Sequence, residues 1–375
     1  MAWKDSLQAP GMCADTTALG RTRWDHAGMS ELRVSAPGAT LAVHTWGPAD
    51  GIPVLLIHGN CSSGLFWEPL VRRLPAQWRI AAPDLRGYGD SDAAPVDATR
   101  GLGEFVDDVL AVIDTVFGAD VAPVVAGHSM GGGIALRLAT EHPTRVAGLL
   151  LEAPLSPYGF GGTRDLQGTP TTDDFAGTGG GGVNPEFIKR LAAKDRGGDD
   201  PASPRNVMRS TYVADPDAFG ADEDALLDTL LSTVVSEDNY PGDTGSSPHW
   251  PMIAPGVKGV LNAMSPRYFN VAEALVGLSP KPPIVWVRGD RDAIVSDASL
   301  FDLANLGKLG AVPGWPGDEQ CPPQPMVGQT RAVLERYAAA GGRFTEVVLT
   351  DCGHSPHIEY PGPFAAQLTG LVTPE

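Results

Sequence analysis

The G-x-S-x-G sequence at residues 127–131 places the tightest constraint on how this chain can fold. It follows an apolar run at residues 123–126 and precedes a stretch rich in Ala and Leu at residues 130–141. This context predicts a sharp turn between a buried strand and a helix. Glycine on both sides of the turn removes Cβ atoms that would clash in so close a bend. Ser129 would then stand at the tip of the turn, either as a nucleophile or simply as a helix cap.

Short apolar runs bounded by turn-forming residues recur along the rest of the chain. Such runs fit strands that are buried on both faces of a parallel sheet. Residues 104–117 and 130–141 have helical patterns between the runs, and this alternation predicts a doubly wound, mostly parallel α/β sheet. Residues 32–35 and 40–46 alternate apolar and polar side chains on either side of Pro37-Gly38, which predicts a hairpin. The apolar runs lie at residues 53–57, 79–82, 123–126 and 146–151, and the sheet pattern resumes at residues 283–287 and 344–349.

The regular pattern stops after residue 154 and resumes at residue 283. The chain between is rich in loops, with helical islands that begin near Asn184, a capping residue, and near Asp222. A long insertion between two parts of one sheet is best interpreted as a lid domain. The predicted organisation is an N-terminal extension at 1–30, an α/β core at 31–154 and 281–375, and a lid at 155–280.

A second glycine-containing loop follows the apolar run at residues 53–57. Residues 58–64 read HGNCSSG, where a strand is expected to end. The backbone N–H groups of Asn60 and Met130 would point at the same oxygen if the two loops lie side by side, which would make an oxyanion hole. The alternative is a plain turn between a strand and a helix.

A serine hydroxyl needs a general base before it becomes a good nucleophile. His354 stands in the sequence DCGHSP, just after the last predicted strand, and Gly353 leaves room for its ring. We therefore predict His354 as the base. His357 is the less favoured alternative, and local packing is the role expected for it and for His128.

The base in turn needs a carboxylate that orients its ring and stabilises the imidazolium. The loop after residues 283–287 reads RGDRDAIV and offers Asp290 and Asp292. Either could serve, and Asp290 could instead form the turn or pair with Arg291. Their place in the chain, between Ser129 and His354, gives the order Ser, Asp, His that is expected for a nucleophile elbow of this kind.

These pieces together resemble the α/β-hydrolase superfamily, and within it the lid-bearing serine esterases, cofactor-free haloperoxidases and meta-cleavage-product hydrolases. The resemblance implies that the acid is the second Asp of the G-D-x-D loop, Asp292, and that the residue after HG, Asn60, supplies an oxyanion N–H. Haloalkane dehalogenases and epoxide hydrolases carry Asp at the nucleophile position, so Ser129 argues against both. The matching segments are HGNCSSG (58–64), PDLRGYGDS (83–91), GHSMGG (127–132), GDRDAIV (289–295) and GHSPHIEYP (353–361).

The function expected from this reading is hydrolysis of a bulky, apolar carboxylic ester or lactone through an acyl-enzyme. The alternatives are a C–C bond hydrolase or a perhydrolase with the same triad, and a non-catalytic ligand receptor on the same fold. Fold alone does not decide among them. The aromatic residues proposed to contact substrate are Trp67, Phe160, Tyr212, Trp250 and Tyr268.

Charge and composition set further expectations. The net charge of −18 disfavours nucleic acid or an anionic membrane as a partner. No apolar run approaches the ~18 residues that span a bilayer, and the N-terminus lacks a secretory pattern. The four cysteines have no metal spacing and are expected to be free thiols in a reducing cytoplasm, although a Cys321–Cys352 disulfide stays compatible with the sequence. No metal or cofactor motif is present, and nothing indicates an oligomeric state.

Overall fold

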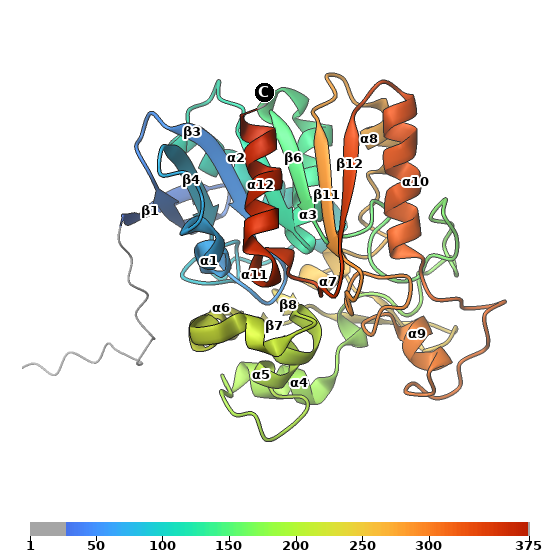
Figure 1. The fold of residues 1–375 in the computed structure, drawn as a ribbon. Helices are drawn as coiled ribbons and strands as arrows, with labels where there is room; N and C mark the ends of the chain where they lie inside the picture. The colour runs from blue at the N-terminus through green and yellow to red at the C-terminus, as the bar shows by residue number, and fades with distance from the viewer. Residues whose placement is uncertain (1–27, 374–375) are drawn as a thin grey trace, which may run out of the picture.

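The fold is built on one twisted eight-stranded sheet (Figure 1). The computed structural model describes residues 28–373, so most of the predicted N-terminal extension, with Cys13, lies outside the described residues. The strands of the sheet are β1 (Met29–Ala36), β2 (Ala39–Trp46), β3 (Ile52–Ile57), β4 (Trp78–Pro83), β5 (Val124–His128), β6 (Gly148–Glu152), β11 (Ile284–Gly289) and β12 (Phe344–Leu349).

The strand order is β1-β2-β4-β3-β5-β6-β11-β12. From β4 to β12 every neighbouring pair is parallel, whereas β2 pairs antiparallel with both β1 and β4. β1 and β2 form the hairpin predicted around Pro37-Gly38, and Gly38 has the positive φ of 78° that the turn requires. The predicted mostly parallel α/β sheet is confirmed.

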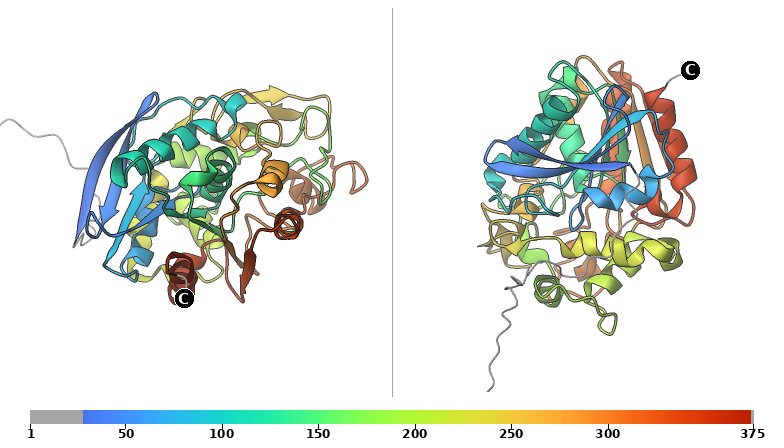
Figure 2. Two further views of the ribbon diagram at one scale, coloured as in Figure 1. Left: turned by 90° about the horizontal axis from the view of Figure 1, so that it is seen from above. Right: turned by 90° about the vertical axis from the view of Figure 1, so that its left-hand side faces the viewer.

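Helices cover both faces of the sheet because its central strands are apolar on both sides. In β3, Leu55 and Ile57 point into one core cluster, and Val54 and Leu56 point into the other. The views in Figure 2 show the sheet between its two helical layers. One layer holds α2 (Gly103–Val116), α3 (Met130–Glu141), α8 (Ala272–Gly277) and α10 (Met326–Ala339), and the other holds α1 (Glu68–Val71) and α12 (Pro361–Val372).

The segment between β6 and β11, called the insertion below, lies largely at one end of the sheet (Figure 1). Its longer helices bury apolar residues in a third cluster, together with Phe66 and Ile358 from the core. The side chain of Asn184 accepts the N–H of Glu186 and so caps the first helix, as the sequence predicts. The elements of the insertion before α8 are α4 (Pro185–Ala192), α5 (Pro204–Val207), α6 (Glu223–Leu231), β7 (Val235–Ser236), β8 (Tyr240–Pro241), β9 (Thr244–Ser246), β10 (Ile253–Pro255) and α7 (Val260–Ala263).

The last helix of the insertion, α8, packs on the main core. Ala272 and Leu275 of α8 are buried in the main core, where α8 packs against α3 and α10. The chain therefore rejoins the core before β11 begins. The lid predicted at 155–280 includes this helix, because a short apolar helix carries no sequence signal of the layer that it joins. After β11, a loop excursion at residues 297–325 contains only the short helix α9 (Leu303–Lys308).

Among residues 28–373, no helix is long and apolar enough to cross a membrane. Cys61, Cys321 and Cys352 are all free thiols, so the structure contains no Cys321–Cys352 disulfide. The same described residues bring no three His, Cys, Asp or Glu side chains together in a way that could hold a metal ion.

Candidate active site

Ser129 is the single residue between β5 and α3, and it makes the turn. Its backbone has φ 55° and ψ −118°, a conformation that is strained for any residue other than glycine. A Cβ atom on Gly127 would lie 2.3 Å from the carbonyl oxygen of Gly131, so the turn closes only with glycine there. The N–H of Ser129 donates to the carbonyl oxygen of Glu152 at 2.9 Å. These contacts hold Ser129, a half-buried residue, at the carboxyl end of the sheet.

His354 and Asp292 meet at the ends of the adjacent strands β12 and β11. The Nδ1 atom of His354 lies 2.8 Å from Oδ2 of Asp292, and both side chains are buried. A carboxylate accepts hydrogen bonds, so Nδ1–H of His354 is the donor in this contact. In the described part of the chain, Nε2 makes no hydrogen bond. A buried carboxylate–imidazole pair of this kind orients the histidine in a catalytic triad.

The other carboxylate of the Asp290/Asp292 pair lies elsewhere. Asp290 is exposed, and its side chain makes no hydrogen bond or ion pair to another described residue. Arg291 lies 3.6 Å from Asp351 rather than against Asp290. The Oδ1 atom of Asp292, by contrast, accepts the N–H groups of Ile294 and Val295 at 2.8 and 3.0 Å. The loop therefore turns Asp292, and not Asp290, toward His354.

The amides of Asn60 and Met130 are free donors. Neither N–H donates a hydrogen bond to any residue within the described range. The side-chain oxygen of Asn60 accepts the N–H of Cys61 and the hydroxyl of Tyr88, which fixes the turn. A Cβ on Gly59 would lie 3.0 Å from the Cβ of Ser129, so this loop touches the serine turn. The loop that carries the Asn60 amide thus touches the turn that carries Ser129 and the Met130 amide.

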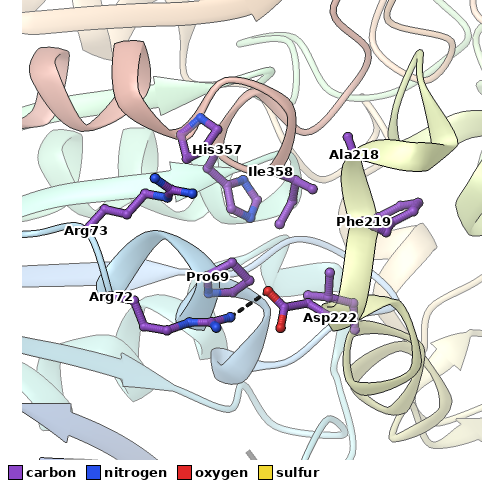
Figure 3. Close-up of a pocket in the computed structure, with 10 residues that line it drawn as sticks. Pro69, Arg72, Arg73, Ala218, Phe219, Asp222, His357 and Ile358 are labelled. Carbon is purple, nitrogen blue, oxygen red and sulfur yellow. Dashed lines mark hydrogen bonds and ion pairs between the residues drawn. The ribbon is translucent and has the colours of Figure 1, made fainter.

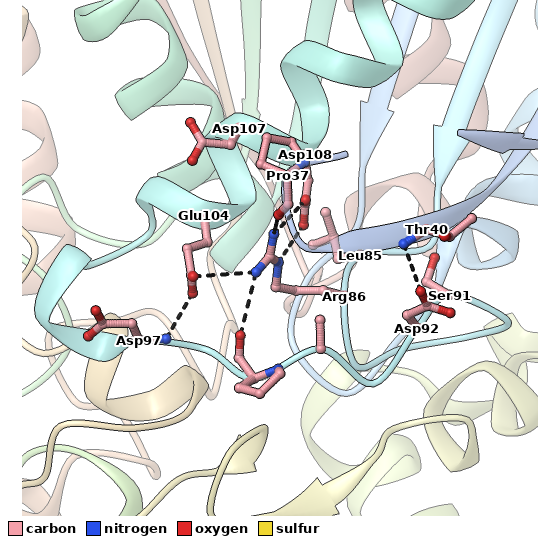
Figure 4. Close-up of polar contacts among 12 residues, drawn as sticks. Pro37, Thr40, Leu85, Arg86, Ser91, Asp92, Asp97, Glu104, Asp107 and Asp108 are labelled. Atoms are coloured by element: carbon pink, nitrogen blue, oxygen red, sulfur yellow. Dashed lines mark hydrogen bonds and ion pairs between the residues drawn. The ribbon is translucent and has the colours of Figure 1, made fainter. Parts of the chain in front are cut away.

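The loop that carries Tyr88 is fastened by a buried ion pair (Figure 4). The guanidinium of Arg86 donates to both carboxylate oxygens of Asp108 on α2 at 2.7 Å, a bidentate geometry. Asp84, at the start of the same loop, accepts the N–H groups of Gly64 and Asp90 at 2.8 Å. These bonds connect the loop after β4 to the loop that presents the Asn60 amide.

The other two histidines near the site have structural contacts. The Nε2–H of His128 donates to the carbonyl oxygen of His354 at 2.9 Å. Burial, with a smaller effect of the nearby histidines, lowers the pKa of His128 well below its ordinary value, so this ring is neutral. The Nδ1 atom of His357 lies 2.8 Å from a carboxylate oxygen of Glu152, and its backbone N–H reaches the same oxygen at 2.7 Å. Both rings support the backbone around His354.

Of the five aromatic residues proposed to contact substrate, the structure brings Tyr212 to the site. Its ring centre lies 6.4 Å from that of His354. The prediction for Trp67 is wrong, because this side chain has no exposed surface and packs 4.4 Å from the His357 ring, inside the core. The sequence around an aromatic residue at the start of a helix does not indicate whether its ring points to the core or to the site.

The three other candidates have contacts elsewhere in the described structure. Phe160 and Tyr268 pack against the main core. The indole N–H of Trp250 donates to the carbonyl oxygen of Pro313 in the 297–325 excursion at 2.8 Å. The sequence could not separate these from Tyr212, because all lie in the irregular insertion.

A pocket of about 330 Å³ lies beside the site, where the insertion meets α1 and α11 (Pro356–Glu359) (Figure 3). Arg72 of the core pairs with Asp222 of the insertion at 2.6 Å across it. Phe219 and Ile358 supply apolar walls. None of Ser129, Asp292 and His354 lines this pocket, so it is separate from the predicted triad.

Sequence reasoning missed Glu152, whose carboxylate is fully buried under the site. The only local signal was one charged residue at the end of the apolar run GLLLE. We expect Glu152→Ala to lower the free energy of unfolding by about 3 kcal/mol, because it leaves the buried His357 ring without its partner. Denaturant unfolding followed by circular dichroism measures this loss.

The matched control is Glu141→Ala, which removes a more exposed carboxylate from an ion pair with Arg137. This variant should lose at most about 1 kcal/mol, the usual range for a surface pair. Equal losses in both variants would show that the buried Glu152–His357 contact contributes no more to the free energy of unfolding than a surface ion pair.

Comparisons with known proteins agree with this architecture. The model of the alpha/beta hydrolase family matches residues 54–367. Lipase LipV of Mycobacterium tuberculosis is 41% identical over 117 residues, which are 30% of this chain and 41% of that protein. The 2-hydroxymuconate semialdehyde hydrolase of Pseudomonas sp. (strain CF600) is 36% identical over 121 residues, 32% of this chain and 41% of that protein. The chain spans about two fifths of the length of the curated relatives it matches.

A solved structure extends the likeness over nearly the whole chain. The esterase RhEst1 from Rhodococcus sp. ECU1013 superposes with a TM-score of 0.55, at 20% identity, over 92% of this chain and 98% of that one. At this identity the likeness concerns the fold alone. The family model covers most of the chain and includes every element that carries the predicted triad. The chain therefore belongs to the alpha/beta hydrolase family.

Proposed function

We propose that this protein hydrolyses a carboxylic ester or lactone through an acyl-enzyme on Ser129. The observation that carries the proposal is the buried 2.8 Å contact of His354 with Asp292, at the same end of the sheet as the strained serine turn. Ser129 attacks the carbonyl carbon while Nε2 of His354 takes its proton, and Asp292 stabilises the imidazolium that forms. His354 then protonates the leaving alcohol, and water releases the acid by the same steps.

The tetrahedral intermediate needs donors for its negative oxygen. The unpaired N–H groups of Asn60 and Met130 support this role, because no described residue competes for them. Met130 is also the first residue of α3, so the helix dipole adds to the stabilisation. Such preorganised donors are worth about 10²–10³ in kcat each.

We infer further that the insertion acts as a lid over a bulky, largely apolar substrate. Its apolar cluster extends to Tyr212 and Val213, and Ile294 from the loop after β11 packs against it. Apolar side chains of the insertion near His354, such as Tyr212, would then bind acyl or aryl groups and exclude water.

Substrate size tests this inference. We expect octanoyl and aryl esters, or a macrocyclic lactone, to exceed an acetyl ester in kcat/KM by about tenfold or more, because binding of the remote group lowers the barrier. The measurement is a panel of p-nitrophenyl esters of graded chain length beside the lactone. A preference for the acetyl ester would contradict a bulky substrate while leaving ester hydrolysis intact.

A C–C bond hydrolase is the second candidate, since one of the similar proteins is a 2-hydroxymuconate semialdehyde hydrolase. It would use the same three residues on a vinylogous diketone. Turnover of such a substrate at a kcat/KM well above that of every ester and lactone in the panel would favour this candidate over the first.

A further inference from the structure

Glu359, the last residue of α11, connects the insertion to the loop that carries His354. Its Oε1 atom accepts the N–H groups of Ala214 and Asp215 at 2.8 and 3.0 Å. Its Oε2 atom accepts the N–H of Gly353, the residue before His354, at 2.5 Å. One half-buried carboxylate thus receives three backbone donors from two segments that are far apart in the sequence.

The same part of the insertion, residues 212–215, is also fastened to the Asn60 loop. The hydroxyl of Tyr212 donates to the carbonyl oxygens of Asn60 and Cys61 at 3.3 and 3.1 Å. We call residues 212–215 the strap. The strap therefore lies between the loop of the proposed oxyanion donor and the loop of the proposed base.

Contact between the strap and the base loop is close enough to require glycine. A Cβ atom on Gly353 would lie 2.5 Å from both the backbone N of Ala214 and the carbonyl carbon of Val213. A small movement of the strap would therefore move Gly353, and the His354 ring follows directly in the chain.

We propose that Glu359 is a positioning residue, which makes the alignment of His354 with Ser129 depend on the strap being seated. The inference rests on the proposed function, since it concerns the geometry of that triad. A carboxylate makes charge-assisted bonds to all three donors, and these are stronger than bonds between neutral groups. With those bonds weakened, the base loop loses its attachment to the insertion, and a displacement of about 1 Å costs on the order of 100-fold in rate.

Other contacts keep the base loop folded when Glu359 is changed. The His354 carbonyl oxygen still accepts the Nε2–H of His128, and His357 still contacts Glu152. A variant at position 359 should therefore loosen one side of the loop without unfolding it. This separates a positioning role from a general structural one.

The test is Glu359→Gln, which keeps the size of the side chain but turns an NH₂ group toward a backbone N–H. We expect kcat to fall about 100-fold, KM to change less than about threefold, and the rate of fluorophosphonate labelling of Ser129 to fall with kcat. Glu359→Asp keeps the charge and should recover part of the loss. The matched control is Glu335→Gln on the exposed face of α10, which should behave as wild type.

A double-variant cycle with Tyr212→Phe tests the role of the strap. If both residues act through it, the double variant loses hardly more than the worse single variant, whereas independent effects multiply. A folded Glu359→Gln protein with kcat within about threefold of wild type, or multiplied effects in the cycle, overturns the inference. If Glu359→Gln does not fold, the comparison of Glu359→Asp with Tyr212→Phe in the same cycle decides.

The wild-type protein tests the proposed function, and the position-359 variants test the inference. If the wild type neither hydrolyses an ester or lactone nor reacts with the fluorophosphonate, the proposed function is wrong and the inference falls with it. If the wild type does both and the position-359 variants match it, only the inference is wrong.

Discussion

Ser129→Ala is expected to lower kcat by about 10⁴- to 10⁶-fold, because it removes the nucleophile of the acyl-enzyme. The fold should be unaffected. The Ser129 side chain makes no hydrogen bond to another described residue, and the backbone bond from its N–H to Glu152 is kept. The measurement is kcat on the best ester of the panel, with the thermal unfolding midpoint recorded beside it.

Covalent labelling gives an independent readout of the same variant. A fluorophosphonate should attach one probe molecule to each wild-type chain, on the peptide that contains Ser129. It should attach none to Ser129→Ala. Ser210→Ala, on the exposed side of the insertion, is the control that should react like the wild type. Residual activity of Ser129→Ala within tenfold of wild type would show that another group is the nucleophile.

The core of the fold could be predicted because its signal is local. Strands buried on both faces must be apolar throughout, so runs such as PVLLI and PVVA stood out against loops rich in glycine and proline. The run predicted at residues 344–349 coincides with β12, and the helix predicted at 130–141 coincides with α3. Each side chain of the predicted triad follows a strand directly, so short motifs were enough to find it.

The supporting contacts could not be predicted, because they join residues that are distant in the sequence. Glu152 and His357 are 205 positions apart, and Glu359 lies 145 positions from Ala214. Neither carboxylate differs locally from a charged residue at the end of a strand or helix. The packing of the insertion is harder still to predict, since its short helices pack partly on the core and partly on one another. No sequence periodicity distinguishes these two kinds of packing.

The histidine loop illustrates how these contacts combine. It is attached to β5 through His128, to β6 through Glu152 and to the insertion through Glu359. The first two attachments are buried within the core, whereas the third depends on a segment that we propose to be part of a lid. This arrangement would make catalysis more sensitive than folding to the position of the insertion.

Asp292→Asn is expected to lower kcat by about 10⁴-fold, the second largest effect of a single side chain here. The Asn oxygen can still accept the N–H groups of Ile294 and Val295, which now bond to Oδ1. Its NH₂ group would then face Nδ1 of His354, which must become the acceptor. The proton moves to Nε2, and the ring can no longer take one from Ser129.

The neighbouring carboxylate supplies the matched control. Asp290 is exposed and has no side-chain bond within the described residues, so Asp290→Asn should keep kcat within about threefold of wild type. Both variants should unfold near the wild-type temperature, since the backbone bonds of the loop are retained. A larger loss in Asp290→Asn than in Asp292→Asn would assign the orienting acid to Asp290. Equal and small losses would mean that His354 acts without a carboxylate, and the proposed triad would then reduce to a pair.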